Sequence, residues 1–185
     1  AILHHMELTY CIVAPVRHPR FPASLRGTFG VIAEALLLGL RNVGVHDGVA
    51  SHNRLPMQGR GRSPSCFSFL NHFEISVHGR KLIGSAQRRT HNAFLQHGSV
   101  IIDSDRERLN SLFLFDNPEK QKQNLERLLE GTVTLNEMCG AISFEGVKQA
   151  FLDGFRQYFA EGMVAGELTP LELKLKDGFF ADVLL

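Results

Sequence analysis

The stretch 74–89, EISVHGRKLIGSAQRR, places a lysine close to three small residues inside what reads as a β-hairpin. Lys81 follows the turn at Gly79-Arg80, and the second strand then carries Gly84-Ser85-Ala86. A strand that only packs against a core favours β-branched and aromatic residues, whereas glycine inside a strand often marks the close approach of a ligand or of another backbone. The pattern therefore indicates a strand that holds a ligand next to a cation.

Cys66 is a second residue that could do chemistry, because it ends a loop that contains Arg60 and Arg62. Nearby cations favour the thiolate, which is the reactive form of a cysteine. A lone cysteine is more often an inert apolar residue, and a lysine at a hairpin tip is usually solvated, so the residues alone leave both interpretations open. Hairpin geometry does not bring Lys81 to Cys66, and the loop 51–65 must fold over the hairpin to do so.

The remaining histidines and cysteines are weaker candidates. His97 could act as a base, although a histidine at the entrance of a strand is more often structural. Cys66 with His72 or His97 could also suggest a thiol hydrolase, but the local signatures of the papain and caspase families are absent. Cys11 lies in an apolar strand and is expected in the core, and Cys139 has no basic neighbours and is expected to be inert.

The composition is that of a single globular domain. The 185 residues are 44% hydrophobic and 21% charged, and 20 Lys+Arg against 19 Asp+Glu give a net charge of +1, which predicts no general affinity for nucleic acid or membranes. The longest apolar run, 35–38, is too short to span a bilayer, and no signal peptide is visible. Three widely spaced cysteines favour a reducing cytoplasm, and the lack of CxxC and HExxH motifs predicts no bound metal.

Periodicity and turn residues predict mixed strands and helices with no internal repeat or linker. The predicted strands cover 7–14, 45–50, 73–78, 81–88 and 94–102, of which the last three form a meander. The predicted helices cover 24–42, 118–130, a segment capped by Ser143 that runs to about 161, and a last segment that starts with the capping box Thr169-Pro170-Leu171-Glu172.

The motif Gly79-Arg80-Lys81, then Gly84-Ser85-Ala86-Gln87, then Gln96-His97-Gly98-Ser99, resembles the lipoate–protein ligase and octanoyltransferase superfamily, which shares its fold with biotin–protein ligases. The resemblance covers essentially the whole chain. It implies an α+β fold, with helices packed on a mixed β-sheet, and one catalytic domain over residues 1–185. Residues 1–10 resemble the piece that follows the family's Arg-Arg-x-x-Gly-Gly-Arg loop, so we expect the chain to lack the family's N-terminal portion.

Within the superfamily, Ser65-Cys66-Phe67 resembles the cysteine-dependent octanoyltransferases, and Gln87 stands where ligases more often have tyrosine. In those enzymes the cysteine carries the acyl thioester and the lysine of the Gly-Arg-Lys motif lowers the pKa of that cysteine. The resemblance thus implies that Cys66 and Lys81 are catalytic. It also implies a substrate-binding set of Gly79, Arg80, Gly84, Ser85, Ala86, Gln87, His97 and Gly98.

The implied reaction is a ping-pong transfer of octanoyl from acyl carrier protein to Cys66, then to a lysine of a lipoyl domain, either of a 2-oxoacid dehydrogenase or of the glycine cleavage H protein. Neither a metal nor another cofactor is implied, and the partners include no nucleic acid or membrane. The small residues would leave room for the acyl chain, and the backbone N–H of Gly84 or Gly98 could face the oxyanion. Arg60, Arg62, Arg80, Arg88 and Arg89 form a cationic set suited to steering acidic carriers.

Three alternatives stay open. An ATP-dependent lipoate–protein ligase shares the Gly-Arg-Lys and Gly-Ser-Ala motifs without needing a thiol. A lipoyl-relay amidotransferase also uses a cysteine but takes octanoyl from a carrier domain rather than from acyl carrier protein. A chain without the N-terminal portion could instead be an inactive protein that only binds lipoyl domains.

Overall fold

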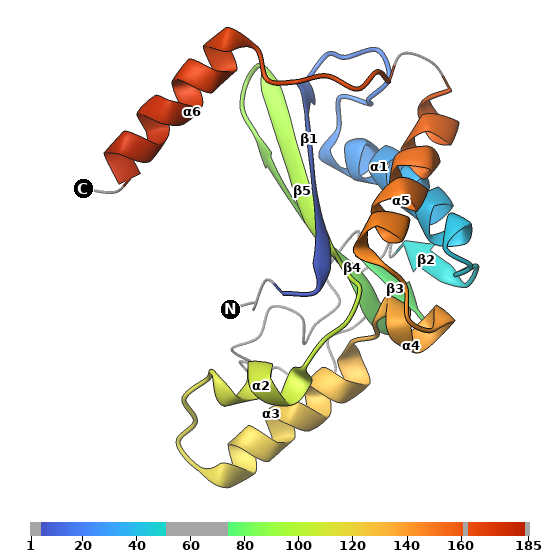
Figure 1. The fold of residues 1–185 in the computed structure, drawn as a ribbon, viewed down its shortest axis with the longest axis vertical. Coiled ribbons are helices and arrows are strands. Elements are labelled where there is room, and N and C mark those ends of the chain that lie inside the picture. Colours follow the sequence, from blue (N-terminus) through green and yellow to red (C-terminus); the bar gives the residue numbers. More distant parts are fainter. Residues whose placement is uncertain (1–4, 51–73, 161–162, 184–185) are drawn as a thin grey trace.

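The structure, a computed structural model, describes residues 5–50, 74–160 and 163–183, with side chains up to residue 176. Five strands form one sheet in the order β1-β5-β4-β3-β2 (Figure 1). The strands are β1 Glu7–Pro15, β2 Gly48–Ala50, β3 Ile75–Val77, β4 Arg80–Arg89 and β5 Ala93–Ile101. The helices are α1 Leu25–Asn42, α2 Arg106–Ser111, α3 Pro118–Gly131, α4 Leu135–Cys139, α5 Phe144–Phe159 and α6 Pro170–Val183.

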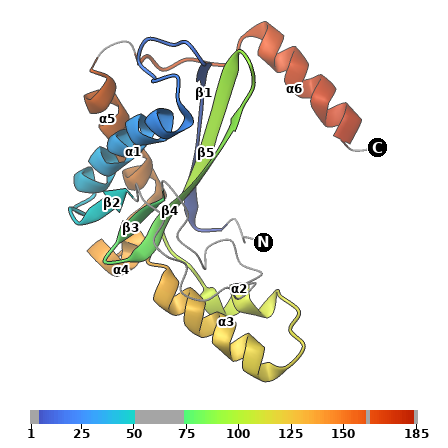
Figure 2. The ribbon, with the colours of Figure 1, turned by 180° about the vertical axis from the view of Figure 1, so that it is seen from behind.

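One face of the sheet is covered by helices. Figure 1 and, from behind, Figure 2 show α1 and α5 side by side against it, while α6 extends away from the body. The apolar residues of α1 recur every three or four positions, so Ile32, Leu36 and Leu40 lie on one stripe and are fully buried. They pack with Ile83 of β4 and Phe151 of α5 in a single core. Burial of this stripe fixes the helices on the sheet.

Most of the predicted elements are confirmed. The capping box at Thr169 is present, since its backbone N–H donates to the Glu172 carboxylate and its hydroxyl accepts from the Glu172 N–H, and Ser143 caps α5. The short helices α2 and α4 were not predicted, because six and five residues are too few to show a helical period. The sheet was predicted to be mixed. The five strands pair antiparallel, and the parallel element is an isolated bridge between Lys81 and Thr132.

A β-bulge changes the side of the sheet to which the lysine of β4 points. Ile83 pairs with Ile75 and Lys81 pairs with Ser76, so Leu82 is an extra residue on β4. Side chains alternate between the faces of a strand, and paired residues share a face. Since Ile75 and Ser76 are neighbours, Lys81 points to the face opposite Ile83, away from α1 and α5.

The rest of β4 divides between these two faces. Ser85, Gln87 and Arg89 follow Ile83 at every second position and therefore lie on the helix-covered face. Gly84, Ala86 and Arg88 lie on the other side, which we call the open face. Because of the bulge, Lys81 lies on the open face as well. In β1 and β5, the open face carries Thr9, Cys11 and His97, all exposed.

No helix among the described residues is both long and apolar enough to cross a membrane.

The β3–β4 turn yields a stability prediction, because both of its central residues, His78 and Gly79, have positive φ angles of 50° and 76°. This is a type I′ hairpin turn. Gly79→Ala should lower the free energy of unfolding by about 1–2 kcal/mol, since a Cβ is disfavoured in the left-handed region although nothing lies within 4 Å of it. Gly30→Ala is the control. Gly30 is helical and also has nothing within 4 Å of an added Cβ, so this change should raise stability by about 0.5–1 kcal/mol. Urea denaturation measures both, and equal effects would contradict the turn assignment.

Candidate active site

Lys81 is buried and forms an ion pair with Glu74. Both side chains are 4% exposed, and the Lys81 ammonium donates to the Glu74 carboxylate. A buried ammonium is costly unless an acceptor compensates it, so this pair is what allows a lysine to lie inside the protein here. The interpretation of Lys81 as a solvated hairpin tip is therefore wrong. Glu74 was missed, because a single acidic residue ahead of a strand carries no signal in the sequence.

The hairpin tip is held against the segment between α3 and α4. The backbone N–H of Val133 donates to the Lys81 carbonyl at 2.9 Å. Beside it, the Arg80 guanidinium lies 2.9 Å from Glu137, which is also 2.5 Å from Arg106. Arg106 in turn donates to the Thr132 hydroxyl at 2.8 Å. Arg80 was predicted to bind substrate, and the structure places it in this ion-paired cluster.

A polar network on the helix-covered face explains the need for a small residue on β5. The Tyr10 hydroxyl lies 2.6 Å from the Ser85 hydroxyl and accepts from the Gln96 amide at 3.2 Å. The Tyr10 ring occupies the space over Gly98, where an added Cβ would lie 2.7 Å from the ring and 2.4 Å from the Gly84 carbonyl. Burial raises the pKa of the Tyr10 phenol, outweighing the hydrogen bonds with Ser85 and Gln96, which lower it.

This network extends to the start of α1. Gln87 donates to the Gln96 side chain at 2.9 Å, and Arg89 donates to Gln87 and to the Thr28 hydroxyl at 3.0 Å each. Arg89 also donates to the Ala23 carbonyl at 2.8 Å. Arg89 thus links the far end of β4 to the N-terminal end of the helix.

The predicted substrate-binding residues are therefore divided between the two faces. Gly84, Ala86 and His97 share the open face with Lys81, and Ala86 pairs with His97. The side chains of Ser85 and Gln87 take part in the network on the helix-covered face. Gly98 lies between Tyr10 and Ser85 in a central strand, where backbone groups are engaged in the ladder, so the structure gives it the role of admitting the Tyr10 ring. Gly79 forms the hairpin turn.

One of the three cysteines, Cys11, differs from the expectation. The predicted nucleophile, Cys66, lies outside the described residues, as do Arg60 and Arg62. Cys11 was expected in the core and is exposed, because its position in β1 faces the open side, opposite His97. Cys139 is also exposed, and partial burial still raises the pKa of its thiol. A raised pKa disfavours the thiolate, consistent with an inert cysteine.

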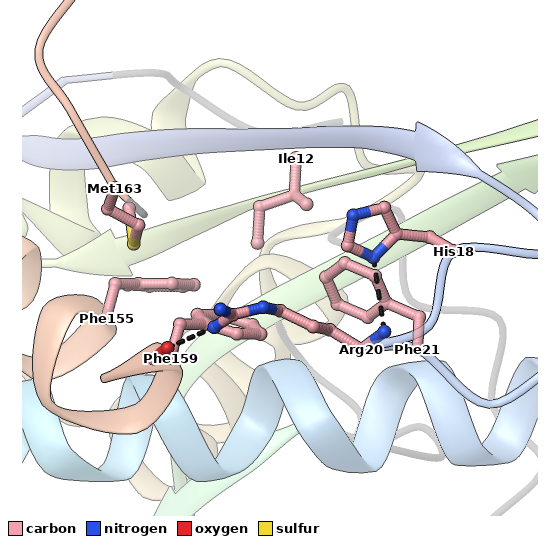
Figure 3. Close-up of a pocket in the computed structure, with 7 residues that line it drawn as sticks. All are labelled: Ile12, His18, Arg20, Phe21, Phe155, Phe159 and Met163. Carbon is pink, nitrogen blue, oxygen red and sulfur yellow. Dashed lines mark hydrogen bonds between the residues drawn. The ribbon is translucent and has the colours of Figure 1, made fainter. Parts of the chain in front are cut away.

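A cavity of about 290 Å³ lies on the helix-covered side, between β1, α5 and the loop that precedes α1 (Figure 3). Its lining is mainly apolar and aromatic and consists of Ile12, His18, Arg20, Phe21, Phe155, Phe159 and Met163. Arg20 is fixed at its edge, since its guanidinium donates to the Phe159 carbonyl and its backbone N–H donates to His18 Nδ1 at 3.3 Å. None of the predicted site residues that the structure describes lines this cavity, which is thus separate from Lys81 and the residues around it.

In the part of the chain that the structure describes, no three His, Cys, Asp or Glu side chains are grouped as metal ligands would be.

Residues 1–156 match the family described as the lipoyl protein ligase A/B catalytic domain. The chain belongs to this family. Among curated members of the family, the octanoyltransferase LipM of Kyrpidia tusciae is 34% identical over 190 residues, covering all of this chain and 68% of its own length. LipM of Bacillus subtilis is 33% identical over 184 residues, covering 95% of this chain and 63% of its own length. The chain thus spans about two thirds of the length of these curated relatives.

Solved structures show the same lipoyl protein ligase fold. A bipartite lipoate protein ligase from Thermoplasma acidophilum, studied with its E2 lipoyl domain, superposes with a TM-score of 0.71 at 16% identity over 95% of this chain and 60% of its own. A lipoate-protein ligase A bound with ATP superposes with a TM-score of 0.68 at 17% identity, over 95% of this chain and 61% of its own. These likenesses confirm the predicted ligase-type fold.

The buried ion pair yields a prediction that separates the electrostatic cost of losing Glu74 from the cost of lost packing. Glu74→Ala should lower the free energy of unfolding by about 3–5 kcal/mol, because it leaves a buried ammonium without its carboxylate. The double variant Glu74→Leu/Lys81→Met should recover most of that loss, since it removes both charges at similar volume. Urea denaturation of the single and double variants is the measurement. If the double variant is as unstable as Glu74→Ala, the loss comes from packing and not from the unpaired charge.

Proposed function

We propose that this protein is an octanoyltransferase that moves an octanoyl group through a thioester on Cys66 to the amine of a lysine on a lipoyl domain. The observation that carries the proposal is the buried Lys81–Glu74 pair, which fixes a cation on the same face as the small residues Gly84 and Ala86. The relatives named octanoyltransferase LipM support the choice of reaction, and Ser65-Cys66-Phe67 supports the choice of nucleophile.

The reaction has two halves. In the first, the Cys66 thiolate adds to the thioester carbonyl of the donor, the bond from that carbon to the donor sulfur breaks, and the donor thiolate leaves. In the second, the lysine amine adds to the Cys66 thioester, the amide bond forms, the Cys66 thiolate is released, and the surplus proton of the amine passes to a base. Negative charge develops on oxygen and sulfur in both halves, and the ammonium of Lys81 would stabilise it.

Glu74 would act as a positioning residue in this scheme. Its carboxylate accepts a hydrogen bond from the Lys81 ammonium and restricts the long, flexible lysine side chain to one place. The ammonium is thus positioned before the acyl donor arrives, so little of the binding energy is needed to order it.

The acyl chain would lie on the open face. Gly84 is partly buried and Ala86 is exposed, and neither presents a side chain beyond a methyl group to a chain that passes over β4. His97 stands beside Ala86 on the neighbouring strand and would border this path. Ser85, Gln87 and Gly98 would shape the path indirectly, by fixing the position of β4 against β5 and Tyr10.

An ATP-dependent lipoate–protein ligase is the second candidate, because the structural relatives include a lipoate-protein ligase A bound with ATP. The two reactions differ in the first covalent product. A transferase forms an acyl thioester on the protein without nucleotide, whereas a ligase forms an acyl adenylate.

The nucleophile is tested by intact mass after mixing with octanoyl-acyl carrier protein in the absence of ATP. We expect the wild-type chain and Cys11→Ala to gain one octanoyl group, and Cys66→Ala to gain none. Cys11→Ala is the matched control, because Cys11 is the described cysteine that is exposed on the open face. Octanoyl gain by Cys66→Ala would rule out the proposed intermediate. Acylation only from an octanoylated lipoyl domain would indicate the relay reaction, and product only with ATP and lipoate would indicate the ligase.

The acyl path is tested by Ala86→Leu. Extra methyl groups on the open face should obstruct a long acyl chain more than a short one, and differences of this size are worth about 1–3 kcal/mol. We expect kcat/KM to fall at least about tenfold more with an octanoyl donor than with a butyryl donor. Ala165→Leu adds the same atoms at an exposed loop position and should leave the ratio of the two donors unchanged. Equal losses for both donors in Ala86→Leu would place the acyl chain elsewhere.

A further inference from the structure

Arginines gather at one end of the sheet without any carboxylate in the neighbouring sequence. Residues 8–33 and 75–102 contain no Asp or Glu. The arginines that these segments place at the β4–β5 end are Arg17, Arg20, Arg26, Arg88 and Arg89. A cluster of one sign produces a field that attracts the opposite charge, although the net charge of the whole chain is only +1.

Hydrogen bonds join the segments that carry these arginines. The N–H of Val16 donates to the carbonyl of Asn92 at 2.9 Å, which joins the loop after β1 to the turn between β4 and β5. Arg89 donates to the Ala23 carbonyl at 2.8 Å and so holds the residues just before α1 against the same turn. Between the loop and the turn is a hollow of about 270 Å³, whose lining includes Arg17 and His91.

Three of the arginines are available to a partner. Arg17, Arg26 and Arg88 are exposed, and none of them makes a hydrogen bond or ion pair with another described residue. Several cations elsewhere are ion-paired, as in Arg80–Glu137, Lys120–Asp116, Lys148–Glu145 and Arg156–Asp153. Arg26 is in the first turn of α1 on the helix-covered side, so we call Arg17 and Arg88 the arginine surface.

We propose that the arginine surface docks an acidic protein domain that delivers the acyl group on a long flexible arm. The proposal rests on the proposed function and adds the place and chemistry of its donor. Arg88 is on the open face of β4, in line with Ala86, Gly84 and Lys81. A carrier bound at this end would therefore direct its arm along the small residues toward the lysine.

The length of the path distinguishes donor from acceptor. Arg88 and Lys81 are seven residues apart on β4, which is roughly 20 Å at about 3.3 Å per residue. The acceptor is a lysine with a four-carbon stem, which is far too short to cover this distance from a domain at the arginine surface. A donor whose thioester is at the end of a prosthetic arm can cover it. The surface therefore fits the acidic acyl donor, and the acceptor domain must approach closer to Lys81.

The experiment compares two donors for acylation of Cys66, octanoyl-acyl carrier protein and the octanoyl thioester of a small soluble thiol. For Arg17→Glu/Arg88→Glu, we expect the ratio of kcat/KM with carrier to kcat/KM with small thioester to fall at least about tenfold. The carrier reaction of the wild-type protein should also slow with added salt more steeply than that of the variant, because salt screens exposed charges. The matched control, Arg108→Glu/Arg127→Glu, makes the same charge change on α2 and α3, distant from this end in Figure 1, and should keep the wild-type ratio.

Several results would overturn the docking site. One is an unchanged ratio of carrier to small-thioester kcat/KM in the arginine variant, and another is an equal fall of that ratio in the control. A third is an arginine variant in which the second half-reaction, with the lipoyl domain, slows more than the first.

Fluorescence anisotropy with labelled carrier gives an independent readout, since the arginine variant should bind the carrier at least about tenfold more weakly than the control does. If the wild-type chain binds a short DNA duplex more tightly than carrier, and the same variant abolishes this, the surface serves nucleic acid instead. A wild-type chain that accepts octanoyl from neither donor contradicts the proposed function, while the anisotropy result still decides the docking site.

Discussion

A buried ammonium must meet a carboxylate, and much of the local structure around Lys81 follows from that requirement. Glu74 can reach the lysine only if the chain reverses within two residues, and the left-handed conformations of His78 and Gly79 provide that reversal. The reversed tip then needs an anchor, which the Val133 N–H supplies at the carbonyl of the lysine itself. The ion pair, the turn and the anchor therefore act as one unit.

The two faces of the sheet have different roles: one fixes the strands, and the other keeps small side chains. On the helix-covered face, Tyr10 lies over Gly98 and bonds Ser85, so three strands are joined by one aromatic residue. This arrangement fixes the positions of the strands without using the opposite face. The open face can then keep small side chains at Gly84 and Ala86 at little cost to the core, because the described core cluster packs against the other face of β4.

The helices and the motif were readable from the sequence, whereas the arrangement of the site was not. Residues 24–42 show their helix through the spacing of apolar residues, and the Gly-Ser-Ala run indicates close approach by composition alone. Tyr10 and Ser85 are 75 positions apart, so no local sequence pattern indicates their contact. Simple alternation would have put Lys81 on the same face as Ser85, because Leu82 is an ordinary strand residue that gives no sign of a bulge. The exposure of Cys11 likewise depends on which face of the sheet it takes. The register of β1 against β5 decides this, and the sequence does not specify that register.

The extra residue at Leu82 makes the bulge itself the feature that sets the side of the lysine. With Leu82 in a regular ladder, Lys81 would lie two positions from Ile83 and share its face, which would turn the ammonium into the apolar core. The bulge must therefore form before Lys81 can meet Glu74. Deleting Leu82 would instead make Lys81 the neighbour of Ile83 in a regular strand, which keeps the ammonium on the open face. Within the family, this segment should therefore tolerate the loss of the bulge residue, but not a change that straightens the bulge while keeping the length.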